Sequence, residues 1–451
     1  MKKYMAHYRQ TFKLAMPVVL GQAGHITVSV ADSMMVGRTG AIPLAAVSLA
    51  TGLFSIMLVI GLGFAYGLTP LVAAADGRHD QRESSVLLKN SLLINVLLAT
   101  VLVIVFWQML PLMHLLKQKP EVIEQAIPFM QLLVLSLLPL MFFSAFKQFA
   151  EGLSDTVTAM YITLAANAIN ILLNYTWVYG HWGFEPMGIK GSGLATFTAR
   201  CLMAVAMFGY VWFAKKFRPY RFGWNMEFIS WAKIKHLLYI GVPVSMQMTF
   251  EVAAFSTAAV LVGQLGSNEL AAHQIALNMA AVTYMMASGL GAAATVRVGN
   301  GVGSGDLHSS RMAGFSALHI VVAFMGLMGI VFTIGRFWLP TFYIDNTEVI
   351  KVASSLLIIA AIFQISDGVQ VVCLGALRGL SDVKIPTAIT LVAYWVLGLP
   401  IGYALAVYAN MGVQGIWYGL LLGLAIAATL LTLRFNHISR QKIQEQTVIT
   451  A

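Results

Sequence analysis

The sequence predicts an all-α polytopic membrane protein with twelve transmembrane helices in two six-helix bundles, related by a pseudo-two-fold axis along the membrane normal. Three observations lead to this fold class: an apolar composition, twelve long apolar runs, and a repeat that divides the chain in two. The 451 residues are 59% hydrophobic and only 10% charged, with a mean hydropathy of +0.78. A soluble protein carries about 25% charged residues, so the composition excludes a soluble globular fold.

Each apolar run is long enough for a helix that crosses a bilayer, which needs about 20 residues. Pro and Gly interrupt several runs, which membrane helices tolerate. The basic N-terminal segment leads into a full-length span without a small-residue cleavage site, so we expect it to be retained and not removed as a signal peptide. The predicted spans are 12–36, 46–75, 86–110, 122–147, 155–180, 188–214, 236–263, 272–299, 310–337, 347–376, 385–409 and 413–434.

Basic residues are unevenly distributed over the predicted loops. They gather before the first span, between spans six and seven, and at the end of the last span. The opposite loops carry only Arg38, Lys117, Lys119, Lys190, Arg336 and Lys351. The positive-inside rule therefore places both termini and the central loop in the cytoplasm. A net charge of +10 could indicate nucleic acid, but the placement of basic residues in short loops between spans indicates the lipid bilayer as the partner, and no nucleic acid.

The central loop between spans six and seven mixes basic residues with Trp224, Phe228 and Trp231. This pattern is typical of an interfacial linker that lies at the lipid headgroups. A regulatory or lipid-sensing element is the alternative.

The two halves of the chain repeat each other at an offset that stays between 224 and 227 residues. The matched segments are GRTGAIPLAAVSLA at 37–50 with GQLGSNELAAHQIA at 263–276, GLSD at 152–155 with GLSD at 379–382, and MGIKG at 187–191 with MGVQG at 411–415. We therefore expect an N-lobe at 1–220 and a C-lobe at 221–451, with six spans each. Parallel repeats of this kind are typical of transporters that work by alternating access, although a duplicated scaffold without movement would show the same repeat.

Three carboxylates lie inside predicted spans: Asp32, Glu251 and Asp367. A buried acid in an apolar span is destabilising unless it is protonated, paired or bound to a cation, so such acids are functional candidates. The repeat register places no acid opposite any of them, because Ala258 corresponds to Asp32, His25 to Glu251 and Leu140 to Asp367. The acids are therefore specialised sites of each half and not part of the shared scaffold.

Glu251 and Asp367 are expected to form a cation-binding pair in the second half. Gln247 lies one helical turn before Glu251, and Gln364 and Gln370 flank Asp367 at a spacing of three. Hard cations favour oxygen ligands, and two neighbouring acids can also share one proton, so Na⁺ and H⁺ both remain open. Pairing with a buried base is the structural alternative, but neither predicted span contains one.

Asp32 is expected to lie with polar residues of spans five and six. These are Asn167, Asn170, Asn174, Thr196 and Arg200. The set predicts a second cation or proton site, or a polar wall of the substrate chamber. Hydrogen bonding between membrane helices is the alternative. Arg200 is either a counter-ion of Asp32 or reaches toward an interface.

Other chemistry has little support in the sequence. Tyr284 and Met286 in span eight are weak candidates for lining a substrate chamber, since Met side chains adapt to many ligands. The two cysteines lie in apolar runs, and the chain has no Walker motif, nucleophilic triad or metal-ligand cluster. We therefore expect no enzyme, no cofactor and no metal beyond a coupling Na⁺ at Glu251 and Asp367.

These residues resemble the multidrug and toxic compound extrusion (MATE) transporters, in particular the NorM branch. The resemblance rests on the two six-span halves, on ADSMMVGRTG at 31–40, on GQLGSNELAAHQI at 263–275, and on the GLSD turns. It implies a monomeric antiporter that exports small organic cations and is driven by Na⁺ or H⁺. It also implies a C-lobe cation site at Glu251 and Asp367, and an N-lobe site at Asp32, Asn170, Asn174 and Thr196.

One position departs from the family pattern. NorM-type proteins can carry a tyrosine four residues before the span-ten aspartate, whereas this chain has Phe363. Two related functions are the alternatives. A DinF-like H⁺-coupled exporter would lack the span-seven glutamate, which is present here as Glu251. A lipid-linked saccharide flippase would need a cationic cleft, where this chain has acids.

Overall fold

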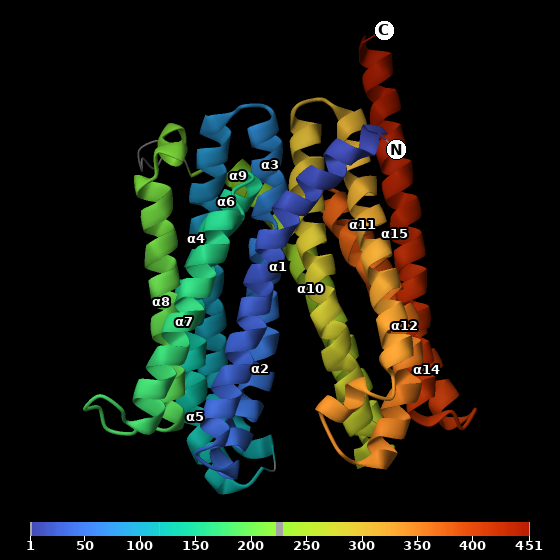
Figure 1. The fold of residues 1–451 in the computed structure, drawn as a ribbon. Coiled ribbons are helices and arrows are strands. Elements are labelled where there is room, and N and C mark those ends of the chain that lie inside the picture. Colours follow the sequence, from blue (N-terminus) through green and yellow to red (C-terminus); the bar gives the residue numbers. More distant parts are fainter. Residues whose placement is uncertain (1, 117, 222–228, 451) are drawn as a thin grey trace. The chain divides into compact units, whose positions relative to one another are not determined.

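All regular elements in residues 2–116, 118–221 and 229–450, the part of the chain that the computed structural model describes, are helical (Figure 1). The first half contains α1 (Lys2–Gly37), α2 (Ala41–Ala65), α3 (Leu68–Gly77), α4 (Gln81–Met109), α5 (Pro120–Leu135), α6 (Leu137–Gly152), α7 (Val157–Tyr179) and α8 (Ile189–Phe213). The second half contains α9 (Trp231–Gly263), α10 (Ser267–Gly303), α11 (Leu307–Gly335), α12 (Thr347–Gly379), α13 (Lys384–Leu391), the π-helical η5 (Val392–Gly398), α14 (Leu399–Val407) and α15 (Gly412–Thr450). Lys117, Trp224 and Phe228 lie outside the described residues.

The described residues include twelve helical stretches that are long and apolar enough to cross a membrane, which confirms the predicted all-α fold. Four spans are built from more than one element: α2 with α3, α4 with the 3-10 helix η1 (Leu110–Leu116), α5 with α6, and α13 with η5 and α14. Some predicted spans were too short. The last predicted span ends at 434, but α15 continues to Thr450, because a helix does not have to end where its apolar stretch ends.

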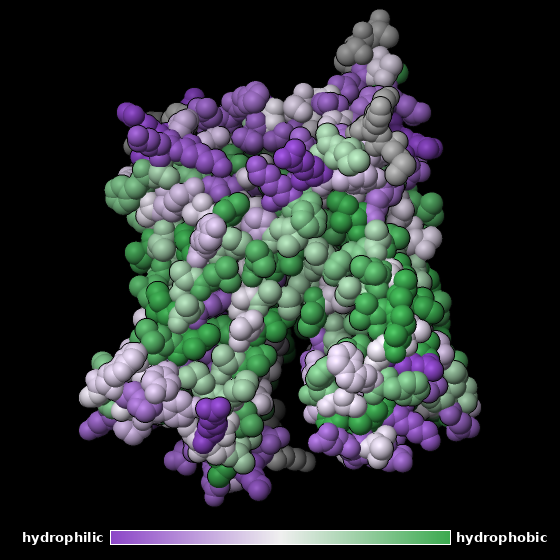
Figure 2. All heavy atoms as spheres, in the orientation of Figure 1, coloured by the Kyte–Doolittle hydropathy of each residue, from purple (hydrophilic) through white to green (hydrophobic). Residues whose placement is uncertain are grey.

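Hydrophobic side chains cover the middle stretches of the helices, and hydrophilic side chains gather at the helix ends (Figure 2). Many large apolar side chains are exposed, for example Val205 at 68% and Ile334 at 80% of their surface. Water-soluble proteins rarely expose apolar patches of such extent. This surface therefore suits contact with lipid.

The helices form two compact units. The N-unit consists of residues 20–72 and 80–245, and the C-unit of residues 1–19, 73–79 and 246–451. The predicted division at 220/221 placed the first 19 residues in the N-lobe, whereas the structure groups them with the C-unit. The predicted division into two lobes itself stays a prediction.

Besides the short segment 73–79, the chain changes from one unit to the other inside α1, after Val19, and inside α9, after Ser245. These two positions are equivalent in the repeat, and each lies two residues after a helix-internal proline, Pro17 and Pro243. A proline removes one helical hydrogen bond and crowds the preceding turn, so it favours a bend at this point.

In the C-unit, α12 is the central helix and packs against α10, α11 and α15. The contact with α10 is close at two glycines. A Cβ atom at Gly375 would lie 2.2 Å from the carbonyl oxygen of Gly291. Small residues of this kind let membrane helices approach backbone to backbone. In the N-unit, α8 packs against α5, α6 and α7.

The repeat of the sequence is also a repeat of local structure. Asp80 and Asp306 cap the N-termini of α4 and α11, and each accepts a 2.8 Å hydrogen bond from the backbone N–H three residues later. The aspartates of the two GLSD turns are also bound by residues at equivalent positions of the repeat. Asp155 accepts a hydrogen bond from Tyr210, and Asp382 forms an ion pair with Arg434.

Candidate functional site

Glu251 is the centre of a hydrogen-bonded cluster in the C-unit. Its side chain lies on α9, eight residues after Pro243, and is only 8% exposed. Gln247 donates to Oε2 of Glu251 and Gln370 donates to Oε1, both at 3.4 Å. Two amide N–H₂ groups therefore face the two oxygens of one buried carboxylate, an arrangement that suits its ionised, acceptor-only form.

Arg378 is connected to this carboxylate through Gln247. Its Nη2 donates a 2.7 Å hydrogen bond to Oε1 of Gln247, whose amide nitrogen faces Glu251. The expectation that neither span carries a base is wrong, because α12 continues past the predicted limit and includes Arg378 in its last turn. The guanidinium thus provides a positive charge near Glu251 through an intervening amide.

Asp367 lies on α12, one turn before Gln370, and is 5% exposed. The structure places its carboxyl group within electrostatic range of Glu251. Two buried acids that repel each other can hold a single proton or cation between them more easily than two negative charges. Of the predicted C-lobe residues, Gln247 and Glu251 are thus in direct contact and Asp367 lies within electrostatic range of Glu251, while their function as an ion site stays a prediction.

Tyr394 is a member of the cluster that the sequence analysis missed. It comes from η5, is fully buried, and its hydroxyl lies 2.9 Å from Nε2 and 3.1 Å from Oε1 of Gln370. The next residue, Trp395, donates a 3.0 Å hydrogen bond to the carbonyl oxygen of Phe250, directly before Glu251. A tyrosine inside an apolar span was the available signal in the sequence. The direction of its side chain depends on the π-helical geometry of η5, and the sequence does not reveal that geometry.

The weaker chamber candidates are distributed differently. Tyr284 lies within electrostatic range of Tyr394, and Met286 packs against the α10–α12 core. Gln364 is buried, and within the described residues neither end of its amide has a hydrogen-bond partner. Its Nε2 instead lies 3.5 Å from the position of a Cβ atom at Gly329 on α11. The structure therefore does not join Gln364 to the Glu251 cluster.

Asp32 joins three helices of the N-unit through amides. Nδ2 of Asn174 donates to Oδ1 of Asp32 at 2.8 Å and to Oδ1 of Asn170 at 2.9 Å. Asn170 in turn donates to Thr196 on α8 at 3.4 Å. The structure thus brings together the four residues predicted for the N-lobe, on α1, α7 and α8. Their binding of a cation or proton stays a prediction.

Arg200 and Asn167 do not bond directly to Asp32. Arg200 donates a 2.6 Å hydrogen bond to Ser136, and its guanidinium lies 5.0 Å from the ring centre of Phe54. Asp32 is within its electrostatic range, but no ion pair joins the two among the described residues. The structure thus places the guanidinium of Arg200 at Ser136 and Phe54, and a role of Arg200 as the counter-ion of Asp32 stays a prediction.

A buried ion pair on α6 was also missed. Lys147 and Glu151 lie 3.7 Å apart, one helical turn from each other, with side chains 17% and 5% exposed. The predicted span ended at 147, so Glu151 was not recognised as an acid within a span. The spacing of four between a lysine and a glutamate was the signal that could have found it.

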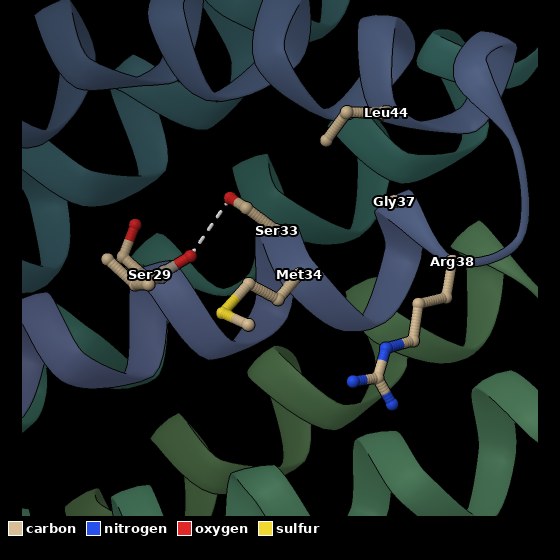
Figure 3. Close-up of a pocket in the computed structure, with 7 residues that line it drawn as sticks. Ser29, Ser33, Met34, Gly37, Arg38 and Leu44 are labelled. Carbon is tan, nitrogen blue, oxygen red and sulfur yellow. Dashed lines mark hydrogen bonds between the residues drawn. The ribbon is translucent and has the colours of Figure 1, made fainter. Parts of the chain in front are cut away.

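An open pocket lies between the C-terminal part of α1 and the start of α2, and Asp32 is not among its lining residues (Figure 3). It has a volume of about 590 Å³ and is lined by Ser29, Val30, Ser33, Met34, Gly37, Arg38 and Leu44. The Ser33 hydroxyl donates to the Ser29 carbonyl oxygen at 2.9 Å, so it is used within the helix. With Arg38 as its only charged lining residue, this pocket is poorly suited to a cation.

Comparison with known proteins gives the same family for both halves of the chain. The MatE family model matches residues 17–176 and 243–404. The two matches begin at the equivalent residues Pro17 and Pro243, which confirms the internal repeat.

Full-length relatives support the same assignment. A "Probable multidrug resistance protein NorM" of Mesorhizobium japonicum is 36% identical over 434 residues, with 95% of this chain and 93% of the relative covered. A protein of the same name in Rhizobium meliloti is 33% identical over 442 residues, with 96% and 94% covered.

Solved structures show the same fold. A eukaryotic MATE transporter superposes with a TM-score of 0.87 at 21% identity, with 98% of this chain and 99% of that chain covered. An outward-facing multidrug resistance MATE family transporter superposes with a TM-score of 0.88 at 19% identity, with 97% of each chain covered.

Proposed function

The chain belongs to the MatE family of transporters and is not an enzyme, and we propose that it is an antiporter that exports small organic cations in exchange for Na⁺ or H⁺. The family and its NorM-type relatives agree with the resemblance found in the sequence motifs. The names of these relatives support drugs as the exported class.

A single observation carries the proposal of ion coupling: Glu251 is buried, faces two amide donors and lies within electrostatic range of Asp367. A pair of acids in an apolar span is stabilised when a cation or proton neutralises one of the charges. Entry and release of that ion thus change the charge of the site by one unit. Asp32, with its donor Asn174, provides a second acid at which the same change can occur.

Continuous helices provide a route from ion binding to movement. Glu251 and Asp32 follow the equivalent prolines of α9 and α1, and both helices continue from one unit into the other. An ion that binds one conformation more tightly than the other shifts the population between them. We infer alternating access, in which ion loading and drug loading favour opposite conformations.

The expected setting is the bacterial inner membrane, with a monomer whose two termini lie in the cytoplasm. The bacterial origin of the NorM-type relatives supports this membrane, and the distribution of basic loops supports the orientation. A tag at either terminus should therefore be accessible only from the cytoplasmic side of intact cells.

Dye efflux from proteoliposomes tests the proposal. A Na⁺ gradient and a pH gradient are imposed in separate experiments. Only the gradient of the coupling ion should drive efflux of a cationic dye. Glu251→Gln should abolish ion-driven efflux. Glu185→Gln, which changes an exposed glutamate in the loop after α7, should leave it unchanged. Full efflux by Glu251→Gln would refute the coupling site.

A further inference from the structure

We propose that Tyr394 is a positioning residue of the Glu251 site, whose hydroxyl allows the Gln370 amide to turn when an ion is loaded. The inference rests on the proposed function, since it concerns ion binding at Glu251. It assigns a role to a residue that neither the acidic pattern nor the predicted glutamine set contains.

The Tyr394 hydroxyl and the Gln370 amide form a closed pair inside the C-unit. Both side chains are fully buried. The hydroxyl is nearly equidistant from the two ends of the amide, at 2.9 Å from Nε2 and 3.1 Å from Oε1. A half-turn of the amide would therefore exchange its nitrogen and oxygen with little change in their distance from the hydroxyl.

The two loading states of Glu251 require opposite ends of this amide. An ionised carboxylate only accepts hydrogen bonds, so the empty site favours the amide nitrogen, which lies 3.4 Å from Oε1 of Glu251. A protonated carboxyl donates, and a hard cation binds oxygen, so either loaded site favours the amide oxygen. The Gln370 amide thus has a reason to turn, whichever ion is coupled.

A tyrosine hydroxyl suits both orientations because it donates and accepts hydrogen bonds. In the empty state it donates to Oε1 of Gln370. In the loaded state it accepts from Nε2. A buried N–H without a partner is rarer and less tolerated than a carbonyl oxygen that lacks one of its bonds. Removal of the hydroxyl should therefore weaken the loaded state more than the empty state.

The position of Tyr394 is fixed by its segment. η5 is π-helical, a form that is frequent at functional sites. The Tyr394 ring packs edge-to-face on Phe255 at 6.0 Å, one turn after Glu251. Trp395 is bonded to the carbonyl oxygen of Phe250 on the same helix. Two consecutive side chains of η5 thus hold the hydroxyl against α9 and α12.

Gln364 shows the alternative situation on the same helix. It is buried like Gln370, but no hydroxyl reaches its amide, and both of its ends lack a hydrogen-bond partner among the described residues. The hydroxyl of Tyr394 is therefore a specific feature of the Gln370 position and not a general property of buried amides in α12.

The test is Tyr394→Phe in proteoliposomes, with the half-saturating concentration of the driving ion measured separately from the maximal rate. Loss of a side chain that orients an ion ligand weakens ion affinity about tenfold. We expect this shift in half-saturation, with the maximal rate at saturating ion nearly unchanged. Tyr403→Phe is the matched control, because Tyr403 lies in the same span and is 43% exposed.

A double-mutant cycle shows whether Tyr394 acts through Gln370. Gln370→Leu should weaken ion affinity, and adding Tyr394→Phe to it should have no further effect. Additive effects would overturn the inference, as would an unchanged half-saturation in Tyr394→Phe or a loss confined to the maximal rate. If Tyr394→Phe does not fold, Tyr394→3,5-difluorotyrosine keeps the shape and weakens the hydroxyl as an acceptor, so ion affinity should again fall.

Failure of this inference is distinguishable from failure of the proposed function. If Glu251→Gln retains ion-driven efflux, the ion site itself is wrongly assigned. If Glu251→Gln abolishes efflux and Tyr394→Phe keeps normal ion affinity, only the role of Tyr394 is refuted.

Discussion

Arg297, near the end of α10, donates a 2.9 Å hydrogen bond to the carbonyl oxygen of His7, near the start of α1. The same guanidinium donates to Thr11 at 2.6 Å and to Gln10 at 2.8 Å. Thr11 also contacts Ser316 of α11 at 3.1 Å. One arginine of the second half thus holds the first turns of the chain, which explains why residues 1–19 belong to the C-unit.

Arg297→Ala should loosen this attachment. Hydrogen bonds to a charged group contribute about 2 kcal/mol each, and losing the set leaves the Thr11 region without its donor. We expect a lower unfolding temperature in detergent and higher protease sensitivity of the first 19 residues. Arg297→Lys should recover only part of the stability, since an ammonium cannot reproduce the planar fork.

The control for this experiment is Arg440→Ala, which removes an exposed arginine at the C-terminal end of α15. Equal unfolding temperatures for Arg297→Ala and Arg440→Ala would show that Arg297 does not secure the start of α1.

Gly375→Ala should separate α10 from α12. The added Cβ would lie 2.2 Å from the Gly291 carbonyl oxygen, and backbone cannot move aside as a flexible side chain can. Overpacking of this kind destabilises by about 1–3 kcal/mol. Gly326→Ala on α11 is the matched control, because nothing lies within 4 Å of its Cβ position. Unfolding temperatures of the two variants should differ clearly, and no difference would contradict the close helix contact.

Lys147→Met should leave Glu151 without its charge partner inside α6. Breaking a buried ion pair by removing one member costs about 3–5 kcal/mol, whereas replacing both members with apolar residues is often neutral. Lys147→Met should therefore accumulate poorly in membranes, and the double variant Lys147→Met with Glu151→Leu should recover. If the double variant is as unstable as the single one, the unpaired charge of Glu151 is not the cause of the instability.

Asn174→Leu should weaken the Asp32 site without unfolding the N-unit. It removes the 2.8 Å donor to Asp32 and the bond to Asn170, while Leu has a similar volume. Loss of one hydrogen bond to a charged group is worth about 1.5–3 kcal/mol, or roughly tenfold or more in affinity. The measurement is the concentration dependence of dye efflux. Ile171→Leu, on the same helix, is the control, and equal efflux by both variants would contradict a role of Asn174.

The C-lobe cluster shows how far helical spacing alone can predict a site. Gln247 and Glu251 are one turn apart, so their contact followed from the period of 3.6 residues, and the Asn170–Asn174 contact followed in the same way. Gln364 had an equally good spacing relative to Asp367, yet its amide lies beside Gly329 on the neighbouring helix. Spacing fixes neighbours on one helix, but a side chain three residues away can still be directed to another helix.

The sequence by itself determined the twelve apolar spans, the repeat and the positions of the three acids, because hydropathy and helical period are local properties of the chain. Only the tertiary structure decided that Arg378 reaches Gln247, that Tyr394 faces Gln370, and that Arg297 holds His7. These contacts join residues from 24 to 290 positions apart. They depend on helix crossings at glycine contacts and on the π-helical turn of η5, which place side chains between helices in ways that no local pattern encodes.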